Sequence, residues 1–381
     1  MKNALWNIPL SLYIHFPWCV RKCPYCDFNS HALTGELPER AYINAILTEL
    51  HSQSAKIHGR QINTIFLGGG TPSLFSADSY QRLLDALKEA LVISPNCEIT
   101  LEANPGTVEQ QRFKAYRDLG INRLSVGVQS FQSDKLKALG RIHDAQEAQR
   151  AIEIAQAVGF TNINIDIMYG LPKQTISEAL WDLQTALNTQ PTHLSWYHLT
   201  LEPHTSFYRF PPPLPTEDIL RKIEMQGKAC IKNHGLQHYE VSAYSLPHYR
   251  CRHNLNYWEF GDYLGLGAGA HSKWTENETG IIYRHWNIKN PKEYLNTSTF
   301  EAGQQQLSFE ELPLEFMMNA LRLQKPIPLS LFSKRTGLTV EKLTHPLQQA
   351  KNQGLLRIQN KHFKVTARGK RYLNDLLALF L

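Results

Sequence analysis

The 381-residue sequence has no long hydrophobic run, since none approaches the roughly 20 apolar residues needed to cross a bilayer. Residues 1–6 also lack the apolar stretch of a secretory signal. These two absences predict a soluble, cytoplasmic protein with no membrane span. Cysteine is scarce as well. Three of the six cysteines lie together between residues 19 and 26, which is typical of reduced thiolate ligands rather than of a disulfide framework.

No second close cysteine pair accompanies this cluster. The other cysteines are isolated in the sequence: Cys97, Cys230 and Cys251. Structural zinc needs four nitrogen or sulfur ligands, so a zinc site would have to recruit His15 or His31. A [4Fe–4S] cube held by Cys19, Cys23 and Cys26 instead leaves one iron with an open coordination position. The spacing favours such a cluster, with zinc as the alternative.

Net charge is small outside the C-terminal part. The chain carries 40 Lys and Arg against 34 Asp and Glu, a net charge of +6. Residues 309–381 hold 12 basic and 5 acidic residues, a net of +7, so the residues before them sum to −1. Any electrostatic attraction to an anionic partner would therefore come from the C-terminal part.

Strand-like runs alternate with stretches of helical period over most of the chain. The predicted strands are residues 10–15, 63–67, 98–102, 123–128, 162–168 and 193–199. The predicted helices are residues 39–56, 76–91, 107–119, 145–158, 175–188 and 217–232. Repeated βα units imply a parallel sheet, because parallel strands need crossover connections. We predict an α/β fold with a partial (β/α)6 barrel.

Three parts are expected: the barrel (1–245), a connector (246–308) and a small C-terminal domain (309–381). The last part has a winged-helix-like α+β order. Its predicted elements are a first helix, helices 328–336 and 340–353, a hairpin of 355–359 and 362–366, and helix 367–379. A basic surplus on a small domain is usually a solvated face, so nucleic acid is not an expected partner.

Polar and glycine-rich residues follow the carboxyl ends of the predicted strands, where such barrels build their sites. They are the cysteine loop and residues 68–72, 102–106, 129–130, 169–172 and 198–202. Residues 68–70 form either a tight turn or a backbone surface that a ligand approaches closely. Glu102 is either a solvated strand-end carboxylate or an acceptor for ligand hydroxyls. Asp166 lies in an apolar run, where a carboxylate is costly without partners.

The C-x3-C-x2-C spacing, with Tyr25 before the third cysteine, resembles the radical S-adenosylmethionine (SAM) superfamily. That resemblance implies that SAM chelates the open iron through its amino and carboxylate groups. It also implies that an electron from the reduced cluster can split SAM into methionine and a 5′-deoxyadenosyl radical.

Further segments resemble the oxygen-independent coproporphyrinogen III oxidase (HemN-like) branch of that superfamily. They are residues 13–17, 68–72, 102–105, 125–130, 140–141 and 166–172. The resemblance implies SAM contacts at Tyr13, Tyr25, Gly69, Gly70, Thr71, Glu102, Gln129, Arg141, Asp166 and Thr200. Whether one or two SAM molecules bind is left open.

Two departures lead away from the oxidase itself. Phe28 stands where the oxidase has a fourth cysteine. Only 18 residues precede Cys19, so we expect the N-terminal segment that covers the oxidase's substrate mouth to be missing. Oxidative decarboxylation of a porphyrinogen is therefore less favoured.

An H-N-x-x-Y-W pattern follows the barrel at His253, Tyr257 and Trp258, and it resembles the HemW group of haem chaperones. His253 and Tyr257 are able iron ligands, and Trp258 offers a flat face for a macrocycle. The alternative is that these side chains only pack the connector against the barrel. Cys251 is a weaker candidate haem ligand. The glycine-rich run 263–272 is similar to loops that close the bottom of the site in this family, and the resemblance implies that His271 lies near the adenosine of SAM.

The favoured function is a haem chaperone that binds haem and a SAM-liganded [4Fe–4S] cluster and transfers haem to acceptor proteins. The alternative is a radical SAM enzyme that acts on a tetrapyrrole, by oxidative decarboxylation or by ring methylation and opening. A winged-helix regulator that senses iron–sulfur status is a third hypothesis. Expected partners are haem, haem-acceptor proteins and an electron donor. A homodimer is compatible with the sequence, which does not fix the oligomeric state or decide whether SAM is cleaved.

Overall fold

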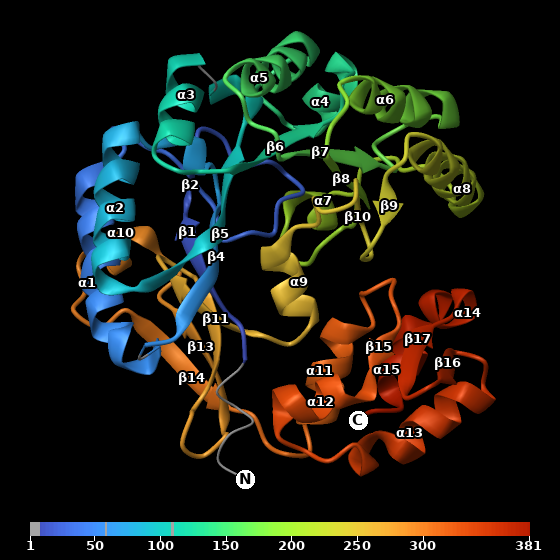
Figure 1. The fold of residues 1–381 in the computed structure, drawn as a ribbon. Coiled ribbons are helices and arrows are strands. Elements are labelled where there is room, and N and C mark those ends of the chain that lie inside the picture. The colour runs from blue at the N-terminus through green and yellow to red at the C-terminus, as the bar shows by residue number, and fades with distance from the viewer. Residues whose placement is uncertain (1–7, 58, 108–109) are drawn as a thin grey trace.

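The computed structural model describes residues 8–57, 59–107 and 110–381. Residues 1–6, on which the expectation of no secretory signal rests, lie outside this range, as do residues 108–109 of the predicted helix 107–119. One curved sheet of 12 strands forms the main body, and helices cover its outer face (Figure 1). Within the described ranges, no helix is both long and apolar enough to cross a membrane.

The six predicted strands and six predicted helices are all present, which confirms the α/β fold. The strands are β1 (Leu10–Phe16), β4 (Gln61–Gly69), β5 (Val92–Ala103), β6 (Arg123–Gln129), β7 (Ile163–Tyr169) and β8 (His193–His198). The helices are α1 (Glu39–Ile57), α2 (Ala77–Ala90), α3 (Gln110–Asp118), α5 (Ala145–Ala157), α6 (Ile176–Asn188) and α8 (Glu217–Asn233). The strands pair in parallel in the order β1-β4-β5-β6-β7-β8.

Burial on both faces of the strands stabilises this arrangement, since nearly every residue of β1 and β6 is buried. Strand residues such as Leu12, Ile65 and Leu101 are fully buried against the apolar faces of the covering helices. Each such side chain contributes about 1.5–3 kcal/mol on leaving water. Short elements fill the crossovers: β2 (Trp18–Cys19), β3 (His31–Ala32), η2 (Pro72–Leu74), η3 (Pro105–Thr107), α4 (Ser133–Ala138), α7 (Ser206–Arg209), β9 (Gln237–His238) and β10 (Ala243–Ser245).

The sheet continues past residue 245 on the other side of β1. β11 (Asp262–Leu266) pairs in parallel with β1, and β12 (His271–Thr275), β13 (Ile282–Asn287) and β14 (Glu301–Gln306) follow antiparallel. We expected a connector here and did not predict these four strands, because their glycines and scattered polar residues break the usual strand alternation. α9 (Arg252–Trp258) packs on β1, β4 and β11 inside the curve of the sheet (Figure 1).

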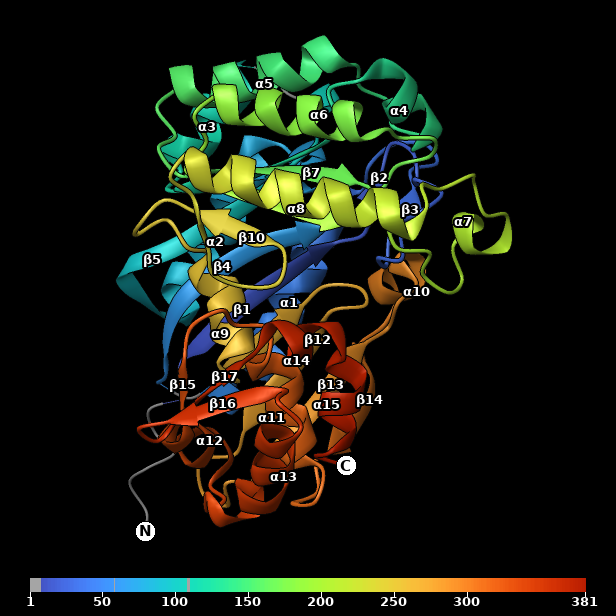
Figure 2. The same cartoon turned by 90° about the vertical axis from the view of Figure 1, so that its right-hand side faces the viewer.

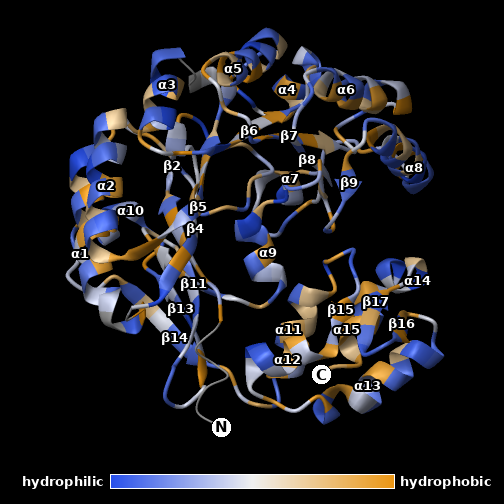
Figure 3. Cartoon of the chain, viewed as in Figure 1, coloured by the Kyte–Doolittle hydropathy of each residue, from blue (hydrophilic) through white to orange (hydrophobic). Residues whose placement is uncertain are grey.

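The C-terminal part has the predicted winged-helix-like order and its own core. Its elements are α11 (Leu312–Ala320), β15 (Ile327–Pro328), α12 (Leu329–Thr336), α13 (Glu341–Asn352), β16 (Leu356–Gln359), β17 (His362–Val365), α14 (Ala367–Arg371) and α15 (Leu373–Ala378). The last predicted helix is interrupted at Tyr372. Phe260 and Ile282 of the main body join this core, so the two parts share apolar contacts. Figure 2 shows this domain beneath α9, and Figure 3 shows hydrophobic and hydrophilic stretches alternating along its helices.

A buried ion network anchors β11 to its neighbours. Asp262 pairs with Lys273 Nζ at 2.9 Å and with Arg60 Nη1 at 2.8 Å. Asp262 is fully buried and the Lys273 side chain is only 2% exposed. Burial alone would raise the pKa of Asp262, but the charges of Lys273 and Arg60 outweigh it and hold that pKa below its ordinary value.

We expect Asp262→Asn to lower the free energy of unfolding by about 3–5 kcal/mol, because Lys273 would keep a buried charge without its partner. Urea unfolding at pH 7 measures this loss. Asp118→Asn is the control, since it breaks the exposed Lys114–Asp118 pair on α3 and should cost less than about 1 kcal/mol. Equal losses in the two variants would contradict the network's role.

Candidate functional site

Backbone hydrogen bonds fix the cysteine loop at the carboxyl end of β1. Its first strand, β2, pairs in parallel with β3, and the Gly70 amide donates to the Phe16 carbonyl at 2.7 Å. The Thr71 amide donates to the Trp18 carbonyl at 2.8 Å. A Cβ on Gly70 would stand 2.6 Å from that same carbonyl oxygen, so the close approach of the two loops requires glycine here.

A pocket of about 400 Å³, here the cysteine pocket, lies at the carboxyl ends of the parallel strands. It brings together the three clustered cysteines and nine of the ten residues expected to contact SAM. These residues are Cys19, Cys23, Cys26, Tyr25, Gly69, Gly70, Thr71, Glu102, Gln129, Arg141, Asp166 and Thr200. The tenth, Tyr13, lines an adjoining pocket instead.

The thiols of this pocket are spaced apart and partly buried. In the described part of the chain, no three His, Cys, Asp or Glu side chains lie close enough to share one metal ion. A cubane cluster takes each cysteine on a different iron, so its ligands stand farther apart than those of zinc. Burial raises the pKa of Cys19 and of Cys26, so these thiols ionise on binding a metal rather than before it.

Polar groups of the barrel face the same thiols. Arg141 Nη1 lies 3.8 Å from Cys23 Sγ, and its Nη2 donates to the Gly127 carbonyl at 2.7 Å. The Ser30 hydroxyl lies 3.6 Å from Cys26 Sγ. The guanidinium places a positive charge beside the cysteines, where a cluster with thiolate ligands would carry negative charge.

Two carboxyl groups lie deeper in the pocket. Glu102 Oε2 accepts from the Gly69 amide at 3.0 Å, and burial, with the charge of Asp166, raises the pKa of Glu102 to about 8. Asp166 accepts from Ser125 Oγ and from Asn164 Nδ2, both at 2.9 Å, while burial raises its pKa. Asp166 therefore has the hydrogen-bond partners that a buried carboxyl group needs. Glu102 has a second carboxyl oxygen that can accept a hydrogen bond from a ligand.

Several lining residues were not predicted from sequence: Ser125, Met168, Ser195 and Tyr197. Tyr197 donates its hydroxyl to Gln129 Oε1 at 2.7 Å, and Gln129 has a φ of 71° at a register shift between β6 and β7. Ser195 and Tyr197 alternate along β8 and so share one face of it. This two-residue alternation can be read from the sequence. Which of the two faces of β8 lines the pocket depends on how the sheet curves, and that cannot be read from the sequence.

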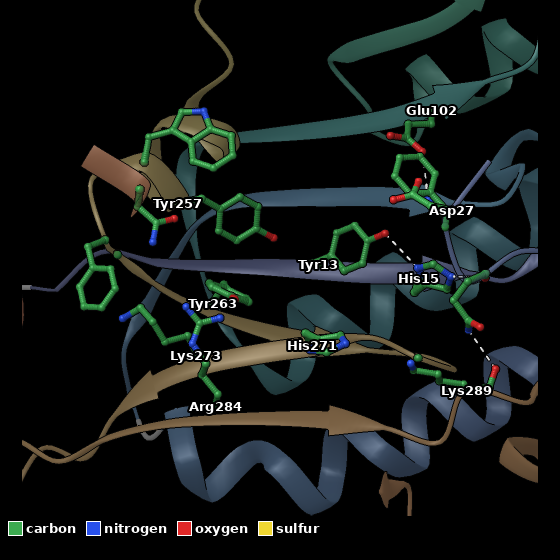
Figure 4. A pocket seen from close by; sticks show the side chains of 18 of the residues that line it. Tyr13, His15, Asp27, Glu102, Tyr257, Tyr263, His271, Lys273, Arg284 and Lys289 are labelled. Atoms are coloured by element: carbon green, nitrogen blue, oxygen red, sulfur yellow. Dashed lines mark hydrogen bonds between the residues drawn. The ribbon is translucent and has the colours of Figure 1, made fainter. Parts of the chain in front are cut away.

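Figure 4 shows a second hollow of about 640 Å³, here the aromatic pocket. It adjoins the cysteine pocket. The two share Asp27, Phe28, Gly69 and Glu102. Its aromatic lining comes from the cysteine loop, β1, α9, the turn after α9 and β11, as Phe28, Tyr13, Tyr257, Trp258, Phe260 and Tyr263. Four cations also line it: Lys22, Lys273, Arg284 and Lys289.

Hydrogen bonds engage both ring nitrogens of His15, which lines this pocket. Nε2 donates to the Asn29 carbonyl at 2.8 Å, so Nδ1 accepts from the Tyr13 hydroxyl at 2.9 Å. Burial lowers the pKa of His15 to about 4, which keeps the ring neutral. His31 Nε2 lies 3.2 Å from Asn29 Oδ1. Neither histidine lines the cysteine pocket.

α9 carries the H-N-x-x-Y-W pattern, and its histidine is buried behind the aromatic pocket. His253 is 1% exposed, and its Nδ1 bonds Thr64 Oγ1 at 2.8 Å while its Nε2 bonds the Tyr257 hydroxyl at 2.9 Å. Thr64 donates onward to Ser11, so Nδ1–H is the donor and Tyr257 donates to Nε2. In this arrangement neither nitrogen of His253 is free for iron. Tyr257 and Trp258 do line the aromatic pocket, whereas Cys251 is fully buried away from it.

Family comparisons match two parts of the chain. Residues 13–185 match the Radical SAM superfamily, and residues 307–372 match the HemN C-terminal domain. Among solved structures, coproporphyrinogen III oxidase (HemN) from Escherichia coli, described as a radical SAM enzyme, aligns with a TM-score of 0.83. The alignment covers 100% of this chain and 91% of that one at 23% sequence identity, so it shows the fold.

Curated relatives match at higher identity over the full length. The protein named Heme chaperone HemW from Escherichia coli (strain K12) is 48% identical over 373 residues, with 98% of each chain covered. The protein of that name from Haemophilus influenzae is 47% identical over 377 residues, again with 98% of each covered. That from Bacillus subtilis (strain 168) is 32% identical, covering 97% of this chain and 99% of the relative.

Glu102 gives a direct test of this electrostatic description. In ligand-free protein we expect its carboxyl group to titrate near pH 8, because burial and the Asp166 charge both disfavour ionisation. Carbon-13 NMR of glutamate-labelled protein would show the transition, and Glu102→Gln should remove it. Asp166→Asn should move the Glu102 transition to lower pH. Titration of Glu102 near its ordinary value of 4.5 would show that the carboxyl group is solvated.

Proposed function

The chain belongs to the HemW family of haem chaperones within the radical SAM superfamily, and we propose that it binds haem beside a SAM-liganded [4Fe–4S] cluster and delivers the haem to acceptor proteins. The observation that carries this proposal is the full-length match to proteins of that name, combined with two adjoining pockets of different chemistry. The first pocket holds thiols and carboxyl groups, and the second is aromatic and cationic.

In this proposal Cys19, Cys23 and Cys26 hold the cluster and leave one iron for SAM. A bound cluster supplies an electron to the sulfonium of SAM when it is reduced. The shared lining of the three thiols supports this assignment, as does the guanidinium of Arg141 beside Cys23. All six cysteines are free, which suits the reducing cytoplasm.

We assign SAM contacts to the residues that share the cysteine pocket with the thiols. Glu102 would accept the ribose hydroxyls, since its Oε2 takes one amide donor and its other oxygen keeps free lone pairs. The backbone at Gly69 and Gly70 would approach the amino group of SAM, where side chains would obstruct it. Asp166 and Gln129 close the inner end of the pocket through their bonds to Asn164 and Tyr197.

The oxidase reaction is not favoured. The full-length relatives of high identity carry the chaperone name, and the likeness to HemN lies in the fold. Phe28 stands where the oxidase pattern has a further cysteine, and this side chain is 58% exposed at the mouth shared by both pockets. Haem is cargo in this account. Its acceptors and the electron donor of the cluster are the partners that the function requires.

Iron content tests the cluster assignment. Anaerobic reconstitution with iron and sulfide should load about four irons per wild-type chain, because three thiolates suffice to hold a cube. The triple variant Cys19→Ser, Cys23→Ser, Cys26→Ser should load almost none. Cys230→Ser is the matched control, since Cys230 is a free thiol bonded to Gln184 and lies outside both pockets. Zinc uptake without four irons in the wild type would refute the assignment.

Haem titration and transfer test the cargo assignment. We expect one haem per chain, with an absorption spectrum distinct from that of free haem, and transfer of that haem to an apo-haemoprotein on mixing. The reduced, SAM-loaded protein should form no protoporphyrinogen from coproporphyrinogen III. Protoporphyrinogen formation at enzymatic rates, without stable haem binding, would instead identify an oxidase.

A further inference from the structure

The aromatic pocket has chemistry that the cluster and SAM leave unused. At about 640 Å³ it exceeds the cysteine pocket, which measures about 400 Å³. Tyr257, Trp258 and Tyr263 give it an aromatic wall, and the Tyr257 and Tyr263 rings meet edge to face at 4.5 Å. Exposed Phe28 stands at its rim. Such a wall offers stacking area to a flat apolar ligand.

The cations of the pocket fall into two classes. Lys273 is paired with Asp262, and Arg284 is paired with Glu315. Lys22 and Lys289 are exposed and make no ion pair with any residue that the structure describes. Cations without a counter-charge at the edge of an apolar hollow suit a ligand with a flat body and carboxylate groups at one side. Haem, with two propionates, is such a ligand.

Three histidines lie in or beside the pocket, and their ring nitrogens differ in availability. His15 and His253 each have both nitrogens in hydrogen bonds and are 5% and 1% exposed. His271 is exposed at the start of β12, and no partner for its ring nitrogens exists among the described residues. Its ring stacks loosely on that of Trp286, its cross-strand neighbour, at 6.4 Å.

Figure 4 places His271 centrally in the lining, with Lys289 on one side and Lys273 and Arg284 on the other. The position follows from the sheet. Tyr263 pairs with Lys273, and His271 lies two residues before Lys273, so the side chains of His271 and Lys273 leave the same face of β12. Gly265 of β11 lies beside Tyr13 of β1, and the His271 carbonyl oxygen lies 2.1 Å from where a Cβ on Gly265 would stand, so the backbone of β12 approaches β11 closely here. The His271 side chain lines the aromatic pocket and is exposed.

Resting on the haem-binding function proposed above, we propose that haem lies in the aromatic pocket with His271 as the axial ligand of its iron. Lys22 and Lys289 pair with the propionates at the open rim. The macrocycle lies against the wall of Tyr257 and Trp258. His253 then acts as a positioning residue, which holds Tyr257 through the 2.9 Å hydrogen bond and does not touch the iron. The sequence pattern had suggested His253 as the iron ligand, whereas this proposal assigns that role to His271 on β12.

The ligand is tested by titrating the full chain with ferric haem, followed by absorption and electron paramagnetic resonance. His271→Ala should lose the imidazole-ligated spectrum and bind haem at least tenfold more weakly, and added imidazole should restore the spectrum. His345→Ala is the control, since His345 lies exposed on α13 and should behave as wild type.

The outcomes separate this inference from the function beneath it. Wild-type spectrum and affinity in His271→Ala would overturn the ligand assignment, and so would a loss of binding that imidazole does not rescue. A wild-type chain that binds no haem would overturn the proposed function itself.

The rim lysines are tested with a charge-reversed double variant, Lys22→Glu with Lys289→Glu. It should bind ferric haem about tenfold more weakly than wild type while binding haem dimethyl ester, which lacks carboxylates, equally well. Lys351→Glu, exposed on α13, is the matched control. An equal loss for both probes would show that the variant disturbs the pocket generally, and no loss for either would remove the lysines from the site. Each result would refute the propionate assignment.

Discussion

The pairing of β1 on both of its edges is the constraint on which the two pockets depend. β1 forms parallel ladders with β4 on one side and with β11 on the other. Leu12 and Ile14 are fully buried on one face, while Tyr13 and His15 turn into the aromatic pocket from the other. The strand then runs directly into the cysteine loop. One strand thereby sets the distance between the thiols and the aromatic wall.

Buried carboxylates attach the later segments to this frame. Glu98 accepts from the Arg252 and His253 amides, each at 3.1 Å, and so fixes the start of α9. Glu49 accepts from the Gly267 amide at 2.9 Å and from Asn287 Nδ2 at 2.6 Å, which holds the glycine-rich turn before β12. Burying a carboxylate is costly without such donors. Three of these four donors are backbone amides, so each carboxylate fixes the position of a chain segment and not only of a side chain.

Much of this was readable from the sequence. The βα alternation predicted every strand from β1 to β8 that forms the parallel sheet, because buried parallel strands are strongly apolar. The polar residues at or near their carboxyl ends, such as Gly69 and Glu102, were therefore predicted to meet, and they do line one pocket. β11 to β14 were not predicted, because their glycines and polar residues give no strand-like pattern in the sequence. These residues form strands because each segment pairs with a neighbouring strand of the sheet. The aromatic pocket is lined by residues of those strands, so the sequence did not predict it either.

The H-N-x-x-Y-W pattern shows the limit of motif reasoning most clearly. Spacing placed His253 and Tyr257 on one helical face, and the structure agrees. Sequence spacing cannot show that Thr64, which is far away in the sequence, forms a hydrogen bond with Nδ1 of His253. The sequence placed His271 near the adenosine of SAM and not near haem, because only the packed structure shows that its ring nitrogens have no partner among the described residues.

Anomalous diffraction at the iron edge, from crystals of protein loaded with both cluster and haem, tests the account most directly. It predicts two separate iron positions, one at the cysteine loop near Arg141 and one in the aromatic pocket within bonding reach of His271. Haem iron bound at His253, or lying outside the hollow bounded by Tyr257 and Lys289, would contradict it.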